Sequence, residues 1–360
     1  MKRTLLSLLI VSSVVLAAAD STKFLGPTGD GHHPQVNSIG KQLWTKTLGV
    51  GYSNVSVVGD KLYTAGFDGT QGVIYCLNAT TGKELWTYKY PTKEGKYKGT
   101  RSTPMIADGK LYFTSRISDT YCLDATTGKK IWSVSSKKVR VKEPTFGSAS
   151  SALIYNGLCI VNLGRAVAFD AKTGKVKWYS RTEYTKAYNT PRTLTIGGNT
   201  MLVITTYEGI VTIDPKTGKT LDLFKWTPPR IGTTITVPVA IGKDQIFIST
   251  AYNTGCAMLK VSPEGNMTQV WKNMNLNNHM ANSMLFAKEG YLVGFHGNTN
   301  AKTPLVAMDV KTGKVLWKRE NVGSGNLIKC GTNLLVIGYT GKVELLKTTR
   351  EGCNVLQSLR

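Results

Sequence analysis

The stretches CLNATTGKELW (residues 76–86), CLDATTGKKIW (122–132), AFDAKTGKVKW (168–178) and AMDVKTGKVLW (307–317) are four copies of one pattern. Degraded copies follow the same pattern at TIDPKTGKTLD (212–222), KVSPEGNMTQVW (260–271) and KTTREGCNVL (347–356). Trp86, Trp132 and Trp178 are each 46 residues apart, and so are Trp271 and Trp317. This period is typical of a repeat architecture, in which stacked units share a continuous core.

Within a unit, apolar and polar side chains alternate in short runs. In the second unit the runs are STPMIA (102–107), KLYFTS (110–115), DTYCLD (119–124) and KIWSVS (130–135). Alternation with a period of two indicates strands, and the Gly109 and Gly128 turns between them supply the positive φ of tight hairpins. Each unit is therefore predicted to be four consecutive antiparallel strands.

An acid or amide lies four residues before the turn glycine in five units: Asn78, Asp124, Asp170, Asp214 and Asp309. Such a side chain accepts hydrogen bonds from the turn amides. These residues recur once per unit with no second carboxylate nearby. We therefore expect them to be structural rather than catalytic or calcium-binding.

Four short antiparallel strands per unit are typical of propeller blades, so the predicted fold class is an all-β β-propeller. Seven units are visible: 51–90, 99–136, 145–181, 189–226, 233–273, 280–320 and 324–360. The segment KQLWTKTL (41–48) has the pattern of a lone fourth strand. This pattern favours an eight-bladed ring, in which the C-terminal part of the last blade is missing, rather than a seven-bladed ring closed by Trp44.

Tryptophans at the start of the fourth strands are predicted to dock each blade on its neighbour. A large ring on an outer strand can cover the TG turn of the next blade. The predicted docking residues are Trp44, Trp86, Trp132, Trp178, Trp271 and Trp317.

The N-terminus has the pattern of a secretory signal peptide. Lys2 and Arg3 precede an apolar run from Leu5 to Leu16, which is shorter than the roughly 20 residues of a membrane span. We expect cleavage after Ala19, an N-terminal extended segment over 20–40 and a propeller domain over 41–360. The mature protein is predicted to be periplasmic or secreted, monomeric and without a membrane span.

The six cysteines are scattered through strand-like segments. Cys76 and Cys122 occupy the same place in successive units, so they should lie on sheets about 10 Å apart. A disulfide requires Cα atoms within about 7 Å. Buried, unpaired thiols are therefore favoured over disulfides.

The chain is strongly basic, because 45 Lys and Arg residues against 22 Asp and Glu residues give a net charge of +23. Such a charge attracts anionic surfaces and polymers but does not indicate a fold. Lysines lie in nearly every turn, which favours a solvated basic shell over a specific polyanion or nucleic-acid site.

The repeat D-x-x-T-G-K-x-x-W resembles the pyrroloquinoline-quinone-type (PQQ-like) propeller repeat. The segments FLGPTGDGHHP (24–34), GTRSTP (99–104), NTGCAMLKVSPEG (253–265) and NNHMAN (277–282) extend the resemblance over the mature chain, which is similar to the BamB-like exported propellers. The same blades serve dehydrogenases and assembly scaffolds. The resemblance therefore implies a fold and not an activity.

The quinone-dependent dehydrogenases of this superfamily stack their cofactor against a disulfide of adjacent cysteines and bind calcium beside a catalytic aspartate. No two cysteines are adjacent here, and no Glu, Asn and Asp set is assignable to calcium. We therefore predict no catalytic residue, no metal ligand and no cofactor, with PQQ kept as a possible cofactor. His32 and His33 alone offer too few ligands for a metal.

Basic and aromatic residues alternate in the loops that join the fourth strand of one unit to the next unit. In a propeller these loops surround one mouth of the channel, where they can bind an anionic or sugar-like ligand. Arg101, Arg192 and His279 are the strongest candidates, although His279 can equally be a loop hydrogen bonder. The predicted ligand-binding residues are Tyr52, Arg101, Lys142, Tyr188, Arg192, Arg230, Asn278 and His279.

The favoured function is an exported, non-catalytic binding or scaffold propeller that recognises a protein segment or an anionic envelope ligand, such as a glycan, on its loop face. The first alternative is a PQQ-dependent oxidoreductase acting on alcohols or sugars. The second is nonspecific polyanion binding through the basic surface.

Overall fold

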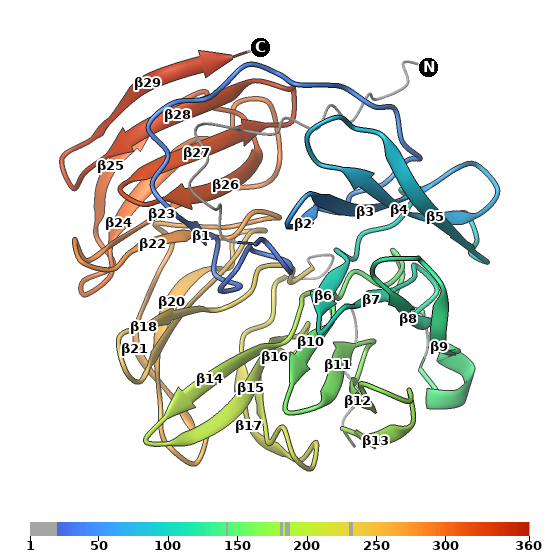
Figure 1. The fold of residues 1–360 in the computed structure, drawn as a ribbon. Helices are drawn as coiled ribbons and strands as arrows, with labels where there is room; N and C mark the ends of the chain where they lie inside the picture. Colours follow the sequence, from blue (N-terminus) through green and yellow to red (C-terminus); the bar gives the residue numbers. More distant parts are fainter. Residues whose placement is uncertain (1–19, 142, 181–182, 184–187, 230–232, 360) are drawn as a thin grey trace. The chain divides into compact units, whose positions relative to one another are not determined.

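The computed structural model describes residues 20–359 except 142, 181–182, 184–187 and 230–232. The predicted signal peptide, residues 1–19, lies outside the described residues. The chain divides into two compact units (Figure 1). Unit 1 contains Met1–Gly29 and Gly40–Glu183, and unit 2 contains Asp30–Ile39 and Tyr184–Arg360.

Unit 1 holds three four-stranded antiparallel sheets, each built from consecutive strands. The first is formed by β2 (Ser56–Val58), β3 (Lys61–Phe67), β4 (Gly72–Asn78) and β5 (Glu84–Tyr90). The second is formed by β6 (Met105–Ala107), β7 (Lys110–Thr114), β8 (Thr120–Asp124) and β9 (Lys130–Val134). The third is formed by β10 (Leu153–Tyr155), β11 (Leu158–Asn162), β12 (Ala166–Asp170) and β13 (Val176–Tyr179).

Unit 2 holds four sheets of the same kind. The first two are formed by β14 (Arg192–Ile196), β15 (Asn199–Thr205), β16 (Gly209–Ile213) and β17 (Thr220–Lys225), and by β18 (Val239–Ile241), β19 (Gln245–Thr250), β20 (Gly255–Val261) and β21 (Met267–Asn273). The last two are formed by β22 (Met284–Phe286), β23 (Tyr291–Phe295), β24 (Leu305–Asp309) and β25 (Val315–Arg319), and by β26 (Gly325–Cys330), β27 (Asn333–Gly338), β28 (Val343–Thr348) and β29 (Cys353–Leu359).

The all-β class and the seven four-strand repeats are thus confirmed, since each predicted unit corresponds to one sheet. Within the described ranges the only helix is the short 3-10 turn η1 (Ser136–Val139), and no helix there is long and apolar enough to cross a bilayer.

The N-terminal segment belongs to the last sheet of unit 2. Strand β1 (His32–His33) pairs in parallel with β26, which makes this sheet five-stranded and mixed. Farther along, the Gln35 carboxamide accepts from the Thr332 amide at 2.8 Å, and Gln357 exchanges two hydrogen bonds with the backbone of Ile39. These bonds hold residues 32–39 along the sheet.

The segment 41–48 does not form a strand. Its Trp44 nevertheless lies on the first sheet, where Nε1 donates to the Ala79 carbonyl at 3.0 Å. A Cβ on Gly82 would lie 2.6 Å from the Trp44 ring, so the indole covers the turn. Among the described residues an eighth sheet is absent, and the predicted truncation of the last blade stays a prediction.

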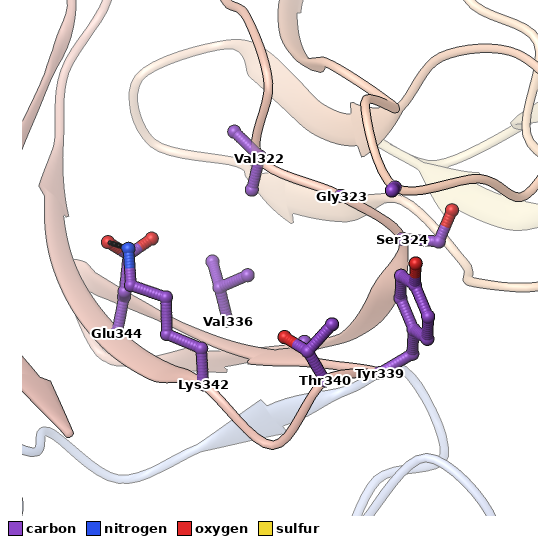
Figure 2. Close-up of a pocket in the computed structure, with 10 residues that line it drawn as sticks. Val322, Gly323, Ser324, Val336, Tyr339, Thr340, Lys342 and Glu344 are labelled. Atoms are coloured by element: carbon purple, nitrogen blue, oxygen red, sulfur yellow. Dashed lines mark ion pairs between the residues drawn. The ribbon is translucent and has the colours of Figure 1, made fainter. Parts of the chain in front are cut away.

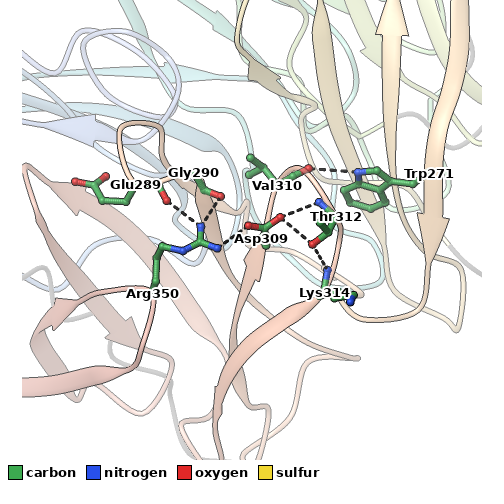
Figure 3. Close-up of polar contacts among 8 residues, drawn as sticks. All are labelled: Trp271, Glu289, Gly290, Asp309, Val310, Thr312, Lys314 and Arg350. Carbon is green, nitrogen blue, oxygen red and sulfur yellow. Dashed lines mark hydrogen bonds and ion pairs between the residues drawn. The ribbon is translucent and has the colours of Figure 1, made fainter.

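Four of the other predicted docking tryptophans make the same contact with the following sheet inside each unit. Trp86, Trp132 and Trp271 donate to the carbonyls of Ala125, Ala171 and Val310 at 3.2, 3.1 and 3.3 Å. Trp317 donates to Thr349 at 2.9 Å, and Trp178 is buried. The indoles of Trp86, Trp132, Trp271 and Trp317 therefore each link their own sheet to the turn of the following sheet (Figure 3, for Trp271).

Side chains of the repeat close the turns on which the indoles lie. The Asp124 Oδ1 atom accepts hydrogen bonds from the amides of Thr126 and Thr127 and from the Thr127 hydroxyl at 2.7–3.0 Å. These bonds stabilise the charged carboxylate and lower the pKa of Asp124. Asn78, Asp170 and Asp309 close their turns in the same way.

Apolar side chains between consecutive sheets form the core. In unit 1, Tyr112, Cys122 and Trp132 of one sheet pack with Cys159 and Phe169 of the next. In unit 2, a corresponding cluster joins Phe247 and Met258 to Leu292 and Met308. The rigid sheets so formed hold their connecting loops in place.

Candidate functional site

The turn between the second and third strands and the loop after the fourth strand leave each sheet from the same end, because successive strands are antiparallel. We call this the loop end of a sheet. Of the predicted ligand-binding residues that the structure describes, Arg101, Tyr188, Asn278 and His279 lie in loops of this kind, Tyr52 lies in the segment just before β2, and Arg192 lies in a strand.

In unit 1 the loop end carries an aromatic and basic surface. The guanidinium of Arg101 lies 5.2 Å from the centre of the Tyr52 ring, and it donates to the carbonyls of Gly99 and Tyr97. The Tyr97 ring meets Phe146 edge-on at 5.6 Å. The side chains of Tyr52 and Tyr97 are 56% and 57% exposed, so both rings remain available to a partner.

A buried arginine that the sequence reasoning missed supports this surface from below. Arg116 is 3% exposed, and its guanidinium donates to the carbonyls of Lys96, Tyr97 and Phe146 at 3.3, 3.2 and 2.9 Å. It therefore ties the loop after β5 to the loop after β9. We define Tyr52, Tyr97, Arg101, Arg116 and Phe146 as the unit 1 platform.

Several other predicted residues do not join this platform. Lys142 and Arg230 lie outside the described residues, and Tyr188 is buried at 6% exposure. Asn278, at 2% exposure, donates to the Phe295 carbonyl at 3.0 Å and accepts from the Ser283 hydroxyl at 2.8 Å. Its amide is thus used in holding its own loop.

Arg192 begins strand β14 and belongs to a charged group in unit 2. Burial lowers the pKa of Arg192, and the carboxylate of Asp30 opposes that shift. The His32 ring lies 3.5 Å from the same carboxylate. Burial also lowers the pKa of His32, assisted by the charges of Lys329 and Arg192. His32 therefore stays neutral near pH 7.

His279 joins the loops of neighbouring sheets in unit 2. Its Nδ1 accepts from the Thr299 amide at 3.0 Å, so the proton of the neutral ring lies on Nε2, which donates to the Tyr252 hydroxyl at 2.7 Å. Tyr252 in turn donates its amide to Asn298 at 3.1 Å. Burial lowers the pKa of His279, which favours this neutral, bridging form.

A small pocket opens at the loop end of the last sheet (Figure 2). Its volume is about 60 Å³. Val322 and Val336 line one part, Tyr339 lies at one side, and Lys342 and Glu344 lie at the other. The sequence reasoning did not single out any of these residues, because they come from three separate segments that share no motif.

The described part of the chain contains no group of three His, Cys, Asp or Glu residues able to hold a metal ion. All six cysteines are free, and five are buried. Burial raises the pKa of Cys76 to about 11 and that of Cys122 to about 12, so these thiols are unreactive near neutral pH.

A family model described as outer membrane protein assembly factor BamB matches residues 35–178 and 70–319 of the chain. No curated protein sequence matches the chain. Among solved structures, BamB from Moraxella catarrhalis is similar with a TM-score of 0.62 and 16% identity over 94% of this chain and 93% of that one.

Two enzymes of the same architecture are also similar. The quinohemoprotein alcohol dehydrogenase ADHIIG from Pseudomonas putida HK5 matches with a TM-score of 0.66 and 13% identity, over 95% of this chain and 72% of that one. The quinohemoprotein alcohol dehydrogenase from Comamonas testosteroni matches with a TM-score of 0.60 and 14% identity, over 86% of this chain and 66% of that one. At these identities the likeness shows the fold alone, which is the predicted propeller of four-stranded blades.

Proposed function

Because the chain belongs to the family described as outer membrane protein assembly factor BamB, we propose that it is a non-catalytic scaffold that binds a protein segment with the loop ends of its sheets. The unit 1 platform is the observation that carries this proposal. It combines two rings that are more than half exposed with an arginine whose side chain is already fixed.

Exposed tyrosines and arginines are enriched in protein-binding surfaces, where they supply large contact area. Arg101 and Arg116 hold the loop through backbone carbonyls, so little conformational freedom is lost when a partner binds. A rigid loop end with aromatic side chains is thus suited to recognition.

The proposed setting is the bacterial cell envelope. The signal pattern of residues 1–19 and the family description both support export of this chain. The net charge of +23 favours a partner segment that is acidic, because opposite charges accelerate association and orient it.

Site-specific photo-crosslinking in the producing cell tests the proposal. A photoreactive phenylalanine at position 52 or 97 is expected to crosslink a defined envelope protein. The matched control is position 176, where Val176 is 41% exposed at the start of β13, at the end of that sheet opposite to its loop end. The proposal fails if positions 52 and 97 give no adduct, or only the adducts found at position 176.

A further inference from the structure

A charge cluster around the buried carboxylate of Glu344 lies at the pocket at the loop end of the last sheet. The Glu344 side chain is 6% exposed, and its Oε1 atom lies 2.7 Å from Lys342 Nζ and 3.0 Å from Arg319 Nη2. These two cations outweigh the burial of the carboxyl and lower the pKa of Glu344, which therefore stays ionised. One carboxylate thus faces two cations.

The cluster therefore has one uncompensated positive charge. Arg319 also has a second nitrogen, Nη1, that is buried and has no hydrogen-bond partner among the described residues. A further cation in this pocket would add to the repulsion, whereas an anion would neutralise it. The net positive charge of the whole chain also favours an anion over a cation in this pocket.

The walls limit the size and shape of an occupant. A water molecule occupies roughly 10–15 Å³ of such a volume, so a pocket of about 60 Å³ holds a group of a few heavy atoms. Val322 and Val336 offer an apolar surface, and Tyr339 is 58% exposed at the rim. A Cβ on Gly323 would lie 3.1 Å from the Ala301 carbonyl, so this wall is already close-packed.

The rim is fixed before any ligand binds. The Tyr339 amide donates to the Ser324 carbonyl at 3.0 Å, and the Ser324 hydroxyl lies 2.8 Å from that of Thr303. The pocket therefore does not have to be assembled by the ligand. Lys342 contributes a flexible ammonium group that is 40% exposed and can reach a group entering from solvent.

We infer that this pocket binds the carboxylate of an acidic side chain, with the methylene groups against Val322 and Val336 and the carboxylate at Lys342. The inference rests on the proposed function, because it assigns to the partner segment an Asp or Glu that anchors it at the last sheet.

Two small probes test the inference on the full chain: the blocked amino acids N-acetylglutamate amide, which carries one carboxylate, and N-acetylglutamine amide, which has the same shape without charge. Methyl NMR signals of Val322 and Val336 report binding at the pocket itself. The glutamate probe is expected to bind at least about tenfold more tightly than the glutamine probe.

Two lysine variants give the matched comparison. Lys342→Met is expected to remove the preference for the glutamate probe. Lys347→Met, at an exposed lysine on β28, the strand that Lys342 immediately precedes, is expected to leave the preference unchanged. Equal affinity for both probes, no shift of either valine, or the same effect of both variants would overturn the inference.

The outcome is separable from that of the proposed function. The probes need no protein partner. A glutamate preference without photo-crosslinks at positions 52 and 97 would support the carboxylate pocket and contradict the scaffold function. Crosslinks at those positions without a glutamate preference would support the scaffold function and contradict the carboxylate pocket.

Discussion

The guanidinium of Arg350 donates to the carboxylate of Asp309 at 2.6 Å, which joins the last sheet to the TG turn of the sheet before it (Figure 3). The other oxygen of Asp309 accepts from the Thr312 amide and hydroxyl at 2.8 Å. Arg350 also donates to the carbonyls of Glu289 and Gly290. One carboxylate therefore closes its own turn and fixes the neighbouring sheet.

Replacing Arg350 by alanine is expected to lower the free energy of unfolding by about 1–2 kcal/mol. The substitution removes a charge-assisted hydrogen bond to a carboxylate that is 15% exposed, while the arginine itself is partly exposed and thus partly screened. Urea denaturation followed by tryptophan fluorescence measures the change. Lys318→Ala, which removes an exposed pair with Glu320, should cost less than about 0.5 kcal/mol and serves as control.

The contribution of Asp309 should also depend on pH. Its pKa is lowered by Arg350 and by the turn hydrogen bonds, although burial opposes this. A lowered folded-state pKa means that the stabilisation is present above the usual value of 3.8 and is lost as the pH falls below it. The deficit of Arg350→Ala relative to the wild type should therefore shrink in acid, and a constant deficit would contradict this account.

The contacts that follow the repeat could be predicted from the sequence. Trp132 and Asp124 recur at fixed positions of every well-preserved unit, and their roles depend only on local turn geometry and on the neighbouring unit. The strand at 41–48 was wrongly expected, because strand formation needs a hydrogen-bonded partner and the described residues offer none to this segment. Repetition therefore reveals the blades but not the exceptions at the chain ends.

Trp132 is expected to be among the most important of the docking residues for stability. It is 7% exposed, its ring lies about 6 Å from those of Tyr112 and Phe169, and its Nε1 donates to Ala171. Trp132→Ala should lower the free energy of unfolding by about 3–5 kcal/mol, because a large cavity remains. Trp132→Phe retains most of the volume and should cost less than half as much in the same denaturation experiment; equal losses for the two variants would contradict the packing argument.

Arg116 illustrates what the sequence does not reveal about the site. Its three acceptors are backbone carbonyls 19 to 30 residues away. Every residue has a backbone carbonyl, so the residue types do not indicate which ones accept from Arg116. The predicted candidates Tyr52 and Arg101 do lie together, since aromatic and basic residues in a loop are visible in the sequence. The residue that orders their loop is invisible until the chain is folded.

Arg116→Met is expected to lower the free energy of unfolding by about 2–4 kcal/mol, because three carbonyls lose a charged donor in a site without access to water. Gly147→Ala should also be destabilising, because a Cβ there would lie 2.5 Å from the Arg116 side chain and the backbone φ of +81° is strained for a residue with a side chain. Increased proteolysis within residues 93–99 would show that the loop has been released. Lys137→Met, on an exposed lysine of η1, is the control and should behave like the wild type.

His279 should give the loops of unit 2 a pH-dependent stability. Its folded-state pKa lies below the ordinary 6.5, so the unfolded chain takes up the proton first, and stability is full above pH 6.5 and falls as the pH decreases. His279→Gln loses the hydrogen bonds to Thr299 and Tyr252 and should be about 1–2 kcal/mol less stable at pH 8. Because glutamine does not titrate, that difference should diminish between pH 7 and roughly pH 5.

The other three histidines also have lowered pKa values. They are present in the wild type and in His279→Gln alike, so the difference between the unfolding free energies of these two proteins reports on His279. Tyr252→Phe removes one hydrogen bond but leaves the imidazole in place, and its difference from the wild type should change less with pH. If His279→Gln instead differed from the wild type by the same amount at every pH, the bridging imidazole would not be held in its neutral form.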